Sequence, residues 1–129
     1  MTGSIDFLYD AANDIVIANL HWNIETEEDV KTWYRQYETY FEAHFNRRVD
    51  IIFVHNDFQI KTSIAVLWGE YRARLIKRYT GLSFRVHSSK RVLLFVQTSG
   101  VRYDVSTQEA ASVEDAIEGI KAMRQRQIS

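Results

Sequence analysis

The chain has 129 residues, of which 46% are hydrophobic, and its formal net charge is -1. This length matches one ordinary domain that buries roughly two-thirds of its unfolded surface, so we expect a single domain over residues 1–129. A net charge near zero provides no overall field that would attract nucleic acid or an anionic membrane. The absence of cysteine excludes disulfides, thiolate metal sites and thiol nucleophiles.

The apolar segments of the sequence are too short to cross a membrane. The longest unbroken runs, such as IIFV and VLLFV, have four or five residues, whereas a bilayer span needs roughly 20. The amino-terminal segment MTGSIDFLYD has neither the basic start nor the apolar stretch of a secretory signal. We therefore expect a soluble, cytoplasmic protein that does not bind a membrane.

The amino-terminal third of the chain predicts a hairpin followed by a helix. Residues 4–10 alternate in polarity and residues 15–22 are mostly apolar, and the turn signal AAND separates them, which is typical of two antiparallel strands. Thr26 and Asp29 have the spacing of a capping box, in which each side chain caps the other's backbone N–H. A helix is therefore expected over residues 27–45.

The central part of the sequence predicts a buried strand that turns into a second helix. VDIIFV, residues 49–54, is a β-branched and apolar run, which indicates a strand covered on both faces at the centre of a sheet. Asn56 and Asp57 follow it as turn-forming residues. Apolar residues at helical spacing then predict a helix over residues 60–79, and Gly81 is expected to end it.

The last third of the sequence predicts a strand, a short helix, a short strand and a closing helix. Residues 82–89 alternate as a half-buried strand, and a serine at its end is expected to cap a helix over residues 90–97. Residues 101–108 predict the last strand, and a capping box that begins at Ser112 opens the closing helix. The whole order predicts an α/β fold with a mixed sheet of about five strands and about four packed helices.

This order of elements resembles the STAS or SpoIIAA-like domains, a family that includes the bacterial anti-sigma factor antagonists. The resemblance covers nearly the whole chain and rests on the hairpin, the helix opened by TEED, the VDIIFV strand, the turn into SIAVLWGEY, and the tail from FRVHSSKRVLLFVQTSGV to SVEDAIEGI. It implies a SpoIIAA-like fold and a bacterial, non-enzymatic regulatory module without a cofactor. It also implies a protein partner, such as a regulatory kinase or an anti-sigma-type protein.

The resemblance points to one turn as the functional site. In this family the turn after the central strand typically reads Asp-Ser-Ser-Gly, and a partner kinase phosphorylates one of its hydroxyls to switch binding. Alignment through the GEY of the second helix places Ile60, Lys61, Thr62 and Ser63 at that turn. This implies Thr62 as the phosphoacceptor and Ser63 as a second candidate. Ile60 stands where the family has the acid and Ser63 where it has the glycine, so the resemblance carries the fold further than the function.

The same turn is a candidate switch on physical grounds. The amino end of a helix offers unpaired amide donors and a partial positive charge, which would stabilise a phosphate on Thr62 or a bound anion beside Lys61. The alternative interpretation is structural: Thr62 and Ser63 satisfy first-turn donors or simply face water. The sequence leaves both interpretations open.

The ends of the predicted strands supply an alternative site. Ligands in open α/β sheets gather beyond the carboxyl ends of parallel strands. His55, Asp57 and His87 could support base-assisted attack, so the alternative function is a small-molecule-binding or hydrolytic protein that uses these residues. No G-x-S-x-G or H-E-x-x-H motif occurs, and we expect neither a catalytic site nor a metal. The candidate anion or ligand residues are His55, Asn56, Asp57, Lys61, His87 and Ser88.

The first predicted helix carries more aromatic residues than one helix face can bury. Some of them should therefore be exposed or meet a partner, and Tyr and Trp are enriched at interface hot spots. We expect a homodimer or a protein complex to form through this helix. The interface candidates are Trp33, Tyr34, Tyr37, Tyr40 and Phe41.

The basic residues of the second helix are expected to be solvated. Arg72, Arg74, Lys77 and Arg78 fall largely off the predicted apolar stripe. Across the chain, 16 Lys and Arg are matched by 17 Asp and Glu, and the aromatic residues lie mostly on predicted core stripes. A nucleic-acid site, which combines basic and exposed aromatic residues, is therefore not expected.

Overall fold

The computed structural model describes residues 3–87, 89–103 and 108–128 of the chain. Within these residues, five strands form one sheet and four α-helices pack on it, which confirms the mixed α/β fold that the sequence predicts. The elements are β1 (Ser4–Asp10), β2 (Ile15–Ile24), α1 (Glu27–His44), β3 (Val49–Ile60), α2 (Ala65–Tyr79), β4 (Thr80–Val86), α3 (Lys90–Tyr103), β5 (Gln108–Ala110) and α4 (Val113–Ile128).

The strands lie in the order β1-β2-β3-β4-β5. β1 and β2 pair antiparallel, and every further neighbouring pair from β2 to β5 is parallel. The amino-terminal hairpin is therefore confirmed, and its turn ends at Asp14, whose φ of 55° is a left-handed conformation that Asp tolerates better than most residues. β3 pairs on both sides, as its apolar sequence predicts.

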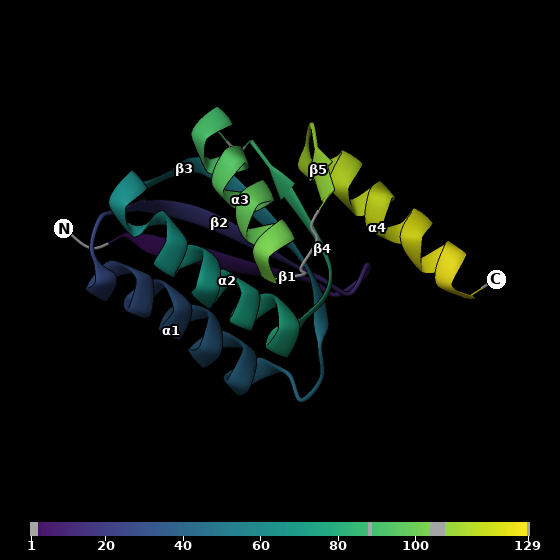
Figure 1. Cartoon of the computed structure of the whole chain (residues 1–129). Coiled ribbons are helices and arrows are strands. Elements are labelled where there is room, and N and C mark those ends of the chain that lie inside the picture. The colour runs from purple at the N-terminus through teal and green to yellow at the C-terminus, as the bar shows by residue number, and fades with distance from the viewer. Residues whose placement is uncertain (1–2, 88, 104–107, 129) are drawn as a thin grey trace.

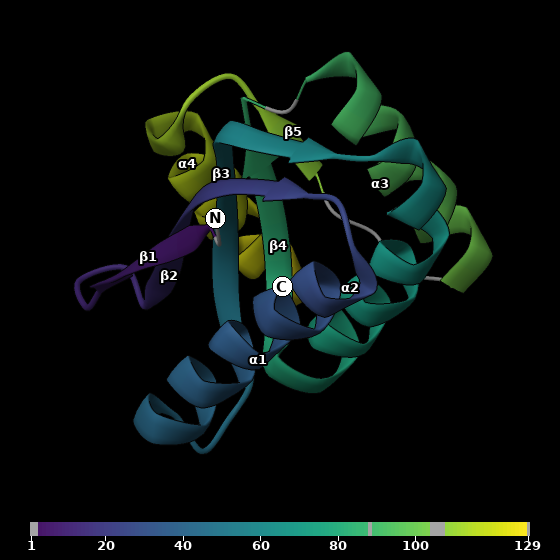
Figure 2. The same ribbon diagram turned by 90° about the vertical axis from the view of Figure 1, so that its left-hand side faces the viewer.

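The helices divide unequally between the two faces of the sheet. α1, α2 and α3 lie side by side on one face, and α4 lies on the other (Figure 1). Figure 2 shows the same division from a second direction. Alternate residues of β3 belong to the hydrophobic cores on the two faces of the sheet. Ile51 packs in the core under α1, α2 and α3, and Ile52 packs with Ala116 and Ile120 of α4. None of the helices in the described ranges is both long enough and apolar enough to span a bilayer.

β3 continues past the turn that the sequence pattern indicates. Its pairing with β2 extends to Ile60, which lies opposite Ile24. The prediction that Asn56 and Asp57 form a turn is therefore wrong. The chain leaves the strand at Lys61, whose backbone N–H still donates to the carbonyl of Ile24 at 2.8 Å.

A β-bulge explains how β3 keeps these polar residues within the sheet. Between Val54 and Asp57, β3 advances by three residues while β2 advances by two. The extra residue reverses the alternation of side chains. As a result Phe58, which is 1% exposed, packs in the same helix-covered core as Phe53. Local sequence shows a polar interruption here, but the apolar residues after it resume strand pairing.

α2 begins later than the sequence predicts. Residues 62–64 form a single 3₁₀ turn, and α2 starts at Ala65 rather than at residue 60. The helix ends at Tyr79, and Gly81, which was expected to stop it, lies within β4. Strand pairing of β4 with β3 therefore begins directly at the end of the helix.

α3 extends beyond its predicted end. It continues to Tyr103, so residues 101–103 are helical rather than part of a strand, and the last strand is only Gln108–Ala110. The hydroxyl of Thr98 donates to the carbonyl of Leu94 at 2.8 Å, and that of Ser99 donates to Val96 at 3.1 Å. Because these polar side chains bond to carbonyls of their own helix, they do not end it.

The helix caps that the sequence predicts are present. Thr26 Oγ1 accepts from the backbone N–H of Asp29 at 3.1 Å, and the Asp29 carboxylate accepts from the N–H of Thr26 at 3.0 Å. Ser112 Oγ accepts from the N–H of Asp115 at 3.1 Å, and Ser89 Oγ accepts from the amide three residues on at 3.2 Å. Ser88, the other candidate cap and ligand residue, lies outside the described residues.

Three of the five interface candidates are buried in the chain's own core. Trp33, Tyr37 and Phe41 are at most 1% exposed, so the prediction that they meet a partner is wrong. α1 packs against β1 and α2, and aromatic rings of those elements cover it on more than one side. Tyr34 and Tyr40 are half-buried, and part of each side chain remains exposed to solvent.

Candidate functional site

The turn between β3 and α2 carries two hydroxyl residues at the surface. Lys61, Thr62 and Ser63 are all exposed, and the 3₁₀ turn is closed by the N–H of Ile64, which donates to the carbonyl of Lys61 at 3.1 Å. The structure thus brings the expected acceptor residues and the neighbouring cation together at the surface. Phosphorylation of Thr62 or Ser63 stays a prediction.

The amino end of α2 keeps its partial positive charge. Its N-cap residue is Ile64, which has no side chain able to cap, and the side chain of Lys61 makes no cap hydrogen bond to the 3₁₀ turn. Neither the 3₁₀ turn nor the first turn of α2 contains an acidic residue. An anion at this position would therefore meet the field of the helix end without a competing carboxylate from the first turn.

A groove lies beside this turn, between α2 and α3. It has a volume of about 270 Å³, and Thr62, Val66, Gly69, Leu94 and Arg102 are among its lining residues. Two of these are large apolar side chains with unusual exposure, Val66 at 62% and Leu94 at 58%. The groove therefore combines an apolar surface with a hydroxyl and a cation at its lining, which suits a protein segment better than a small polar molecule.

The three residues of the hydrolytic alternative differ in burial. His55 is 6% exposed and stacks on Phe58, with ring centroids 4.9 Å apart. Asp57 has 82% of its side chain exposed and lies 3.8 Å from His21, and His87 is also exposed. The bulge turns Asp57 away from His55, so these two side chains do not lie together, and the small-molecule or hydrolytic alternative stays a prediction. Within the described ranges, no group of three His, Asp or Glu side chains is arranged to hold a metal ion.

The structure also contains a buried basic cluster that the sequence analysis missed. Arg72 was expected on a solvated face but is 4% exposed, and Arg85 is 6% exposed. Burial, reinforced by Arg85, lowers the pKa of Arg72 to about 10. Burial lowers the pKa of His55 to about 3, with smaller contributions from the positive charges of Arg72 and Arg85. Its ring is therefore neutral at pH 7. Arg72 follows Trp68 by four residues, a spacing that places both on one helix face and could have indicated its burial.

Comparison with known proteins identifies the fold. No protein-family model matches the sequence, and no curated protein matches it. The structure is similar to that of the anti-sigma factor antagonist SpoIIAA in its unphosphorylated form, with a TM-score of 0.57, 15% identity, and coverage of 94% of this chain and 98% of that chain. It is also similar to the Bacillus cell fate determinant SpoIIAA in the phosphorylated form, with a TM-score of 0.58, 17% identity, and coverage of 91% and 99%. The chain therefore has the SpoIIAA-like (STAS) fold that its order of elements predicts.

Proposed function

We propose that the chain is a non-enzymatic regulatory module that binds a protein partner in the groove between α2 and α3, and that phosphorylation of Thr62 switches this binding. The observation that carries the proposal is the position of Thr62, an exposed residue that also lines the groove. SpoIIAA, whose fold is similar, is known in an unphosphorylated and a phosphorylated form. By analogy, the proposal takes this protein to be bacterial and cytoplasmic, and its partner to be a regulatory kinase or an anti-sigma-type protein.

A phosphate on Thr62 would change the groove strongly. It brings about -1.5 to -2 charges to a position beside the exposed apolar side chains of Val66 and Leu94. The amino end of α2 and the cation of Lys61 would stabilise that phosphate on this chain. An apolar partner segment, in contrast, would have to be buried next to it. Phosphorylation is therefore expected to release a partner that binds the apolar groove.

Ser63 serves as an internal reference for this proposal. It is exposed like Thr62 and lies next to it in the 3₁₀ turn, but it is not among the residues that line the groove.

A homodimer through α1 is not part of the proposal, because three of the five aromatic residues that suggested it are buried within the chain.

The first test changes the charge at the turn. A pull-down from native extract would compare the wild-type protein with Thr62→Glu and Ser63→Glu. We expect the wild type and Ser63→Glu to recover one common protein partner and Thr62→Glu to lose it. Recovery of that partner by Thr62→Glu would reject Thr62 as a charge-sensitive switch.

The second test changes the groove itself. Leu94, at 58% exposed, lines the groove, whereas Leu8 of β1 is 59% exposed and does not. The two positions therefore form a matched pair for the same substitution. Leu94→Glu should lose the partner and Leu8→Glu should keep it, with circular dichroism used to check that both variants are folded. Equal recovery by the two variants would place the partner elsewhere.

A further inference from the structure

A small cavity lies inside the core, where α1, α2 and α3 meet the sheet. Its volume is about 10 Å³, which is room for about one water-sized particle. Polar side chains from four elements line it, namely Trp33 of α1, His55 of β3, Trp68 and Arg72 of α2, and Arg85 of β4. Phe53 and Val96 complete the lining, so the cavity combines hydrogen-bond donors with apolar walls.

Three hydrogen-bond donors at this cavity lack an acceptor. The indole nitrogens of Trp33 and Trp68 and the Nη2 atom of Arg72 are buried, and none has a hydrogen-bond partner within the part of the chain that the structure describes. The two indole rings are close, with centroids 5.7 Å apart. Indole and guanidinium groups can only donate. Of the described side chains that line the cavity, only the neutral ring of His55 has an acceptor nitrogen, so the lining side chains cannot satisfy all three donors.

The charge of Arg72 also has no counter-charge among the described residues. The hydrogen bond that Arg72 makes goes from Nη1 to the neutral hydroxyl of Ser99 at 3.0 Å, and no carboxylate of the described residues forms an ion pair with it. The other buried guanidinium, that of Arg85, pairs with the carboxylate of Glu109 at 3.8 Å. His55 is neutral at pH 7 and supplies no negative charge. The guanidinium of Arg72 is thus buried without an ion pair among the described carboxylates, an arrangement that is costly in a low-dielectric core.

We propose that this cavity binds a monatomic anion, such as chloride, to which Trp33, Trp68 and Arg72 donate hydrogen bonds. The small volume favours a monatomic ion over phosphate, sulfate or a carboxylate head group. Water is the competing occupant, but a water molecule offers two acceptor lone pairs to three donors and neutralises no charge. A halide can accept all three hydrogen bonds and compensates the charge of Arg72. The inference does not depend on the proposed function, since the cavity lies in the core and not in the groove.

The first test measures stability against chloride. The midpoint of thermal unfolding would be followed while chloride rises from about 1 mM to about 200 mM, with gluconate holding the ionic strength constant because that ion is too large for the cavity. We expect the midpoint of the wild-type protein to rise by several degrees. A midpoint that depends only on ionic strength would overturn the proposal.

Two arginine variants on the same helix sharpen this test. Arg72→Met removes a charge and a donor from the cavity, and it should abolish the chloride dependence. Arg74→Met is the matched control, because Arg74 is exposed and pairs with Glu70 at 3.0 Å, and it should keep the dependence. Chloride dependence that persists in Arg72→Met would overturn the proposal.

A spectroscopic test covers the case in which Arg72→Met does not fold. Bromide quenches tryptophan fluorescence on contact, and Trp22→Phe leaves Trp33 and Trp68 as the only indoles. We expect quenching of this variant to saturate at millimolar bromide, which indicates a bound ion. Trp33→Phe, which keeps a ring but loses a donor, should shift the saturation to higher bromide. Quenching that rises linearly without saturation would indicate collision only and would contradict the site.

Discussion

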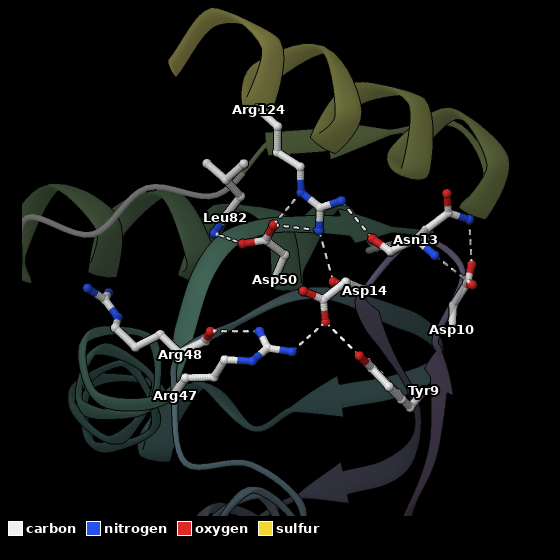
Figure 3. A network of polar contacts seen from close by, with 9 residues as sticks. All are labelled: Tyr9, Asp10, Asn13, Asp14, Arg47, Arg48, Asp50, Leu82 and Arg124. Atoms are coloured by element: carbon white, nitrogen blue, oxygen red, sulfur yellow. Dashed lines mark hydrogen bonds and ion pairs between the residues drawn. The ribbon is translucent and has the colours of Figure 1, made fainter. Parts of the chain in front are cut away.

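Arg124 of α4 and Asp50 of β3 form an ion pair between residues 74 positions apart in the sequence (Figure 3). The Nε and Nη2 atoms of Arg124 lie 2.9 and 2.8 Å from Oδ2 of Asp50. The same guanidinium donates to the carbonyls of Asn13 at 2.6 Å and Asp14 at 2.9 Å, and the backbone N–H of Leu82 donates to the second oxygen of Asp50 at 2.7 Å. One side chain thus ties α4 to the central strand and to the β1–β2 turn.

This relationship predicts that Arg124 is a major anchor of α4. Arg124→Met should lower the free energy of unfolding by about 2–4 kcal/mol, because it leaves the Asp50 carboxylate, only 17% exposed, without its cation. Urea denaturation measures this change. The control is Lys121→Met on the same helix, whose exposed pair with Glu118 at 3.6 Å should be worth less than about 0.5 kcal/mol. Equal losses in the two variants would contradict the anchoring role.

The capping box at the start of α1 gives a second prediction. Thr26→Ala should lower the free energy of unfolding by about 1 kcal/mol, because the N–H of Asp29 loses the hydroxyl that accepts its hydrogen bond. Thr26→Ser retains that hydroxyl and should be close to the wild type. Chemical denaturation of the three proteins measures their free energies of unfolding. A Thr26→Ser variant as unstable as Thr26→Ala would show that the methyl group, and not the cap, stabilises the protein.

The features that the sequence predicts correctly depend on residues close together in the chain. The caps at Thr26 and Ser112 need only a hydroxyl and an amide three residues away. The hairpin needs a short turn between an alternating segment and an apolar one, and the central strand is identified by its own unbroken apolar run. In each case the physical cause lies within one segment, so a local pattern is sufficient.

The features that the sequence analysis missed depend on other segments. Residues 55–57 stay in the sheet because β2 continues to pair with β3 beyond the bulge. Arg72 is buried because side chains from β3, β4 and α1 close around it. The turn at Thr62 was found through the family resemblance, but the groove beside it was not, since its two walls come from α2 and α3.

The close approach of α2 and α3 gives a third prediction. A Cβ atom added to Gly69 would lie 2.8 Å from Cβ of Ser99, which is closer than ordinary carbon contacts allow. Gly69→Ala should therefore lower the free energy of unfolding by about 1–3 kcal/mol, although alanine is favoured over glycine in a helix by about 1 kcal/mol. A Gly69→Ala protein more stable than the wild type would show that the helices separate at little cost.

A double-mutant cycle attributes this effect to the contact. Ser99→Gly removes the clashing atom, and it also removes the hydrogen bond from Arg72, so it has a cost of its own. The cycle subtracts that cost. If the contact is the cause, Gly69→Ala should be less harmful in the Ser99→Gly background than in the wild type. Urea denaturation of the four proteins measures the coupling.

The neutral, buried His55 gives a prediction about acid stability. Burial, followed by the charges of Arg72 and Arg85, lowers its pKa from 6.5 to about 3 in the folded protein. Between these values the unfolded chain binds a proton at His55 that the folded chain does not bind. The free energy of unfolding should therefore fall as the pH drops below about 6.5, by up to about 1.4 kcal/mol per pH unit from this residue, with no such contribution above that pH.

His55→Gln tests this prediction, because glutamine does not titrate. The comparison uses the slope of stability against pH, since the substitution in a packed core also changes the absolute stability. Urea denaturation between about pH 6.5 and about pH 4.5, in buffers without halide, should show a shallower slope for the variant than for the wild type. Parallel slopes would mean that His55 accepts its proton in the folded state as readily as in the unfolded chain. The ring would then be open to solvent on the timescale of the measurement.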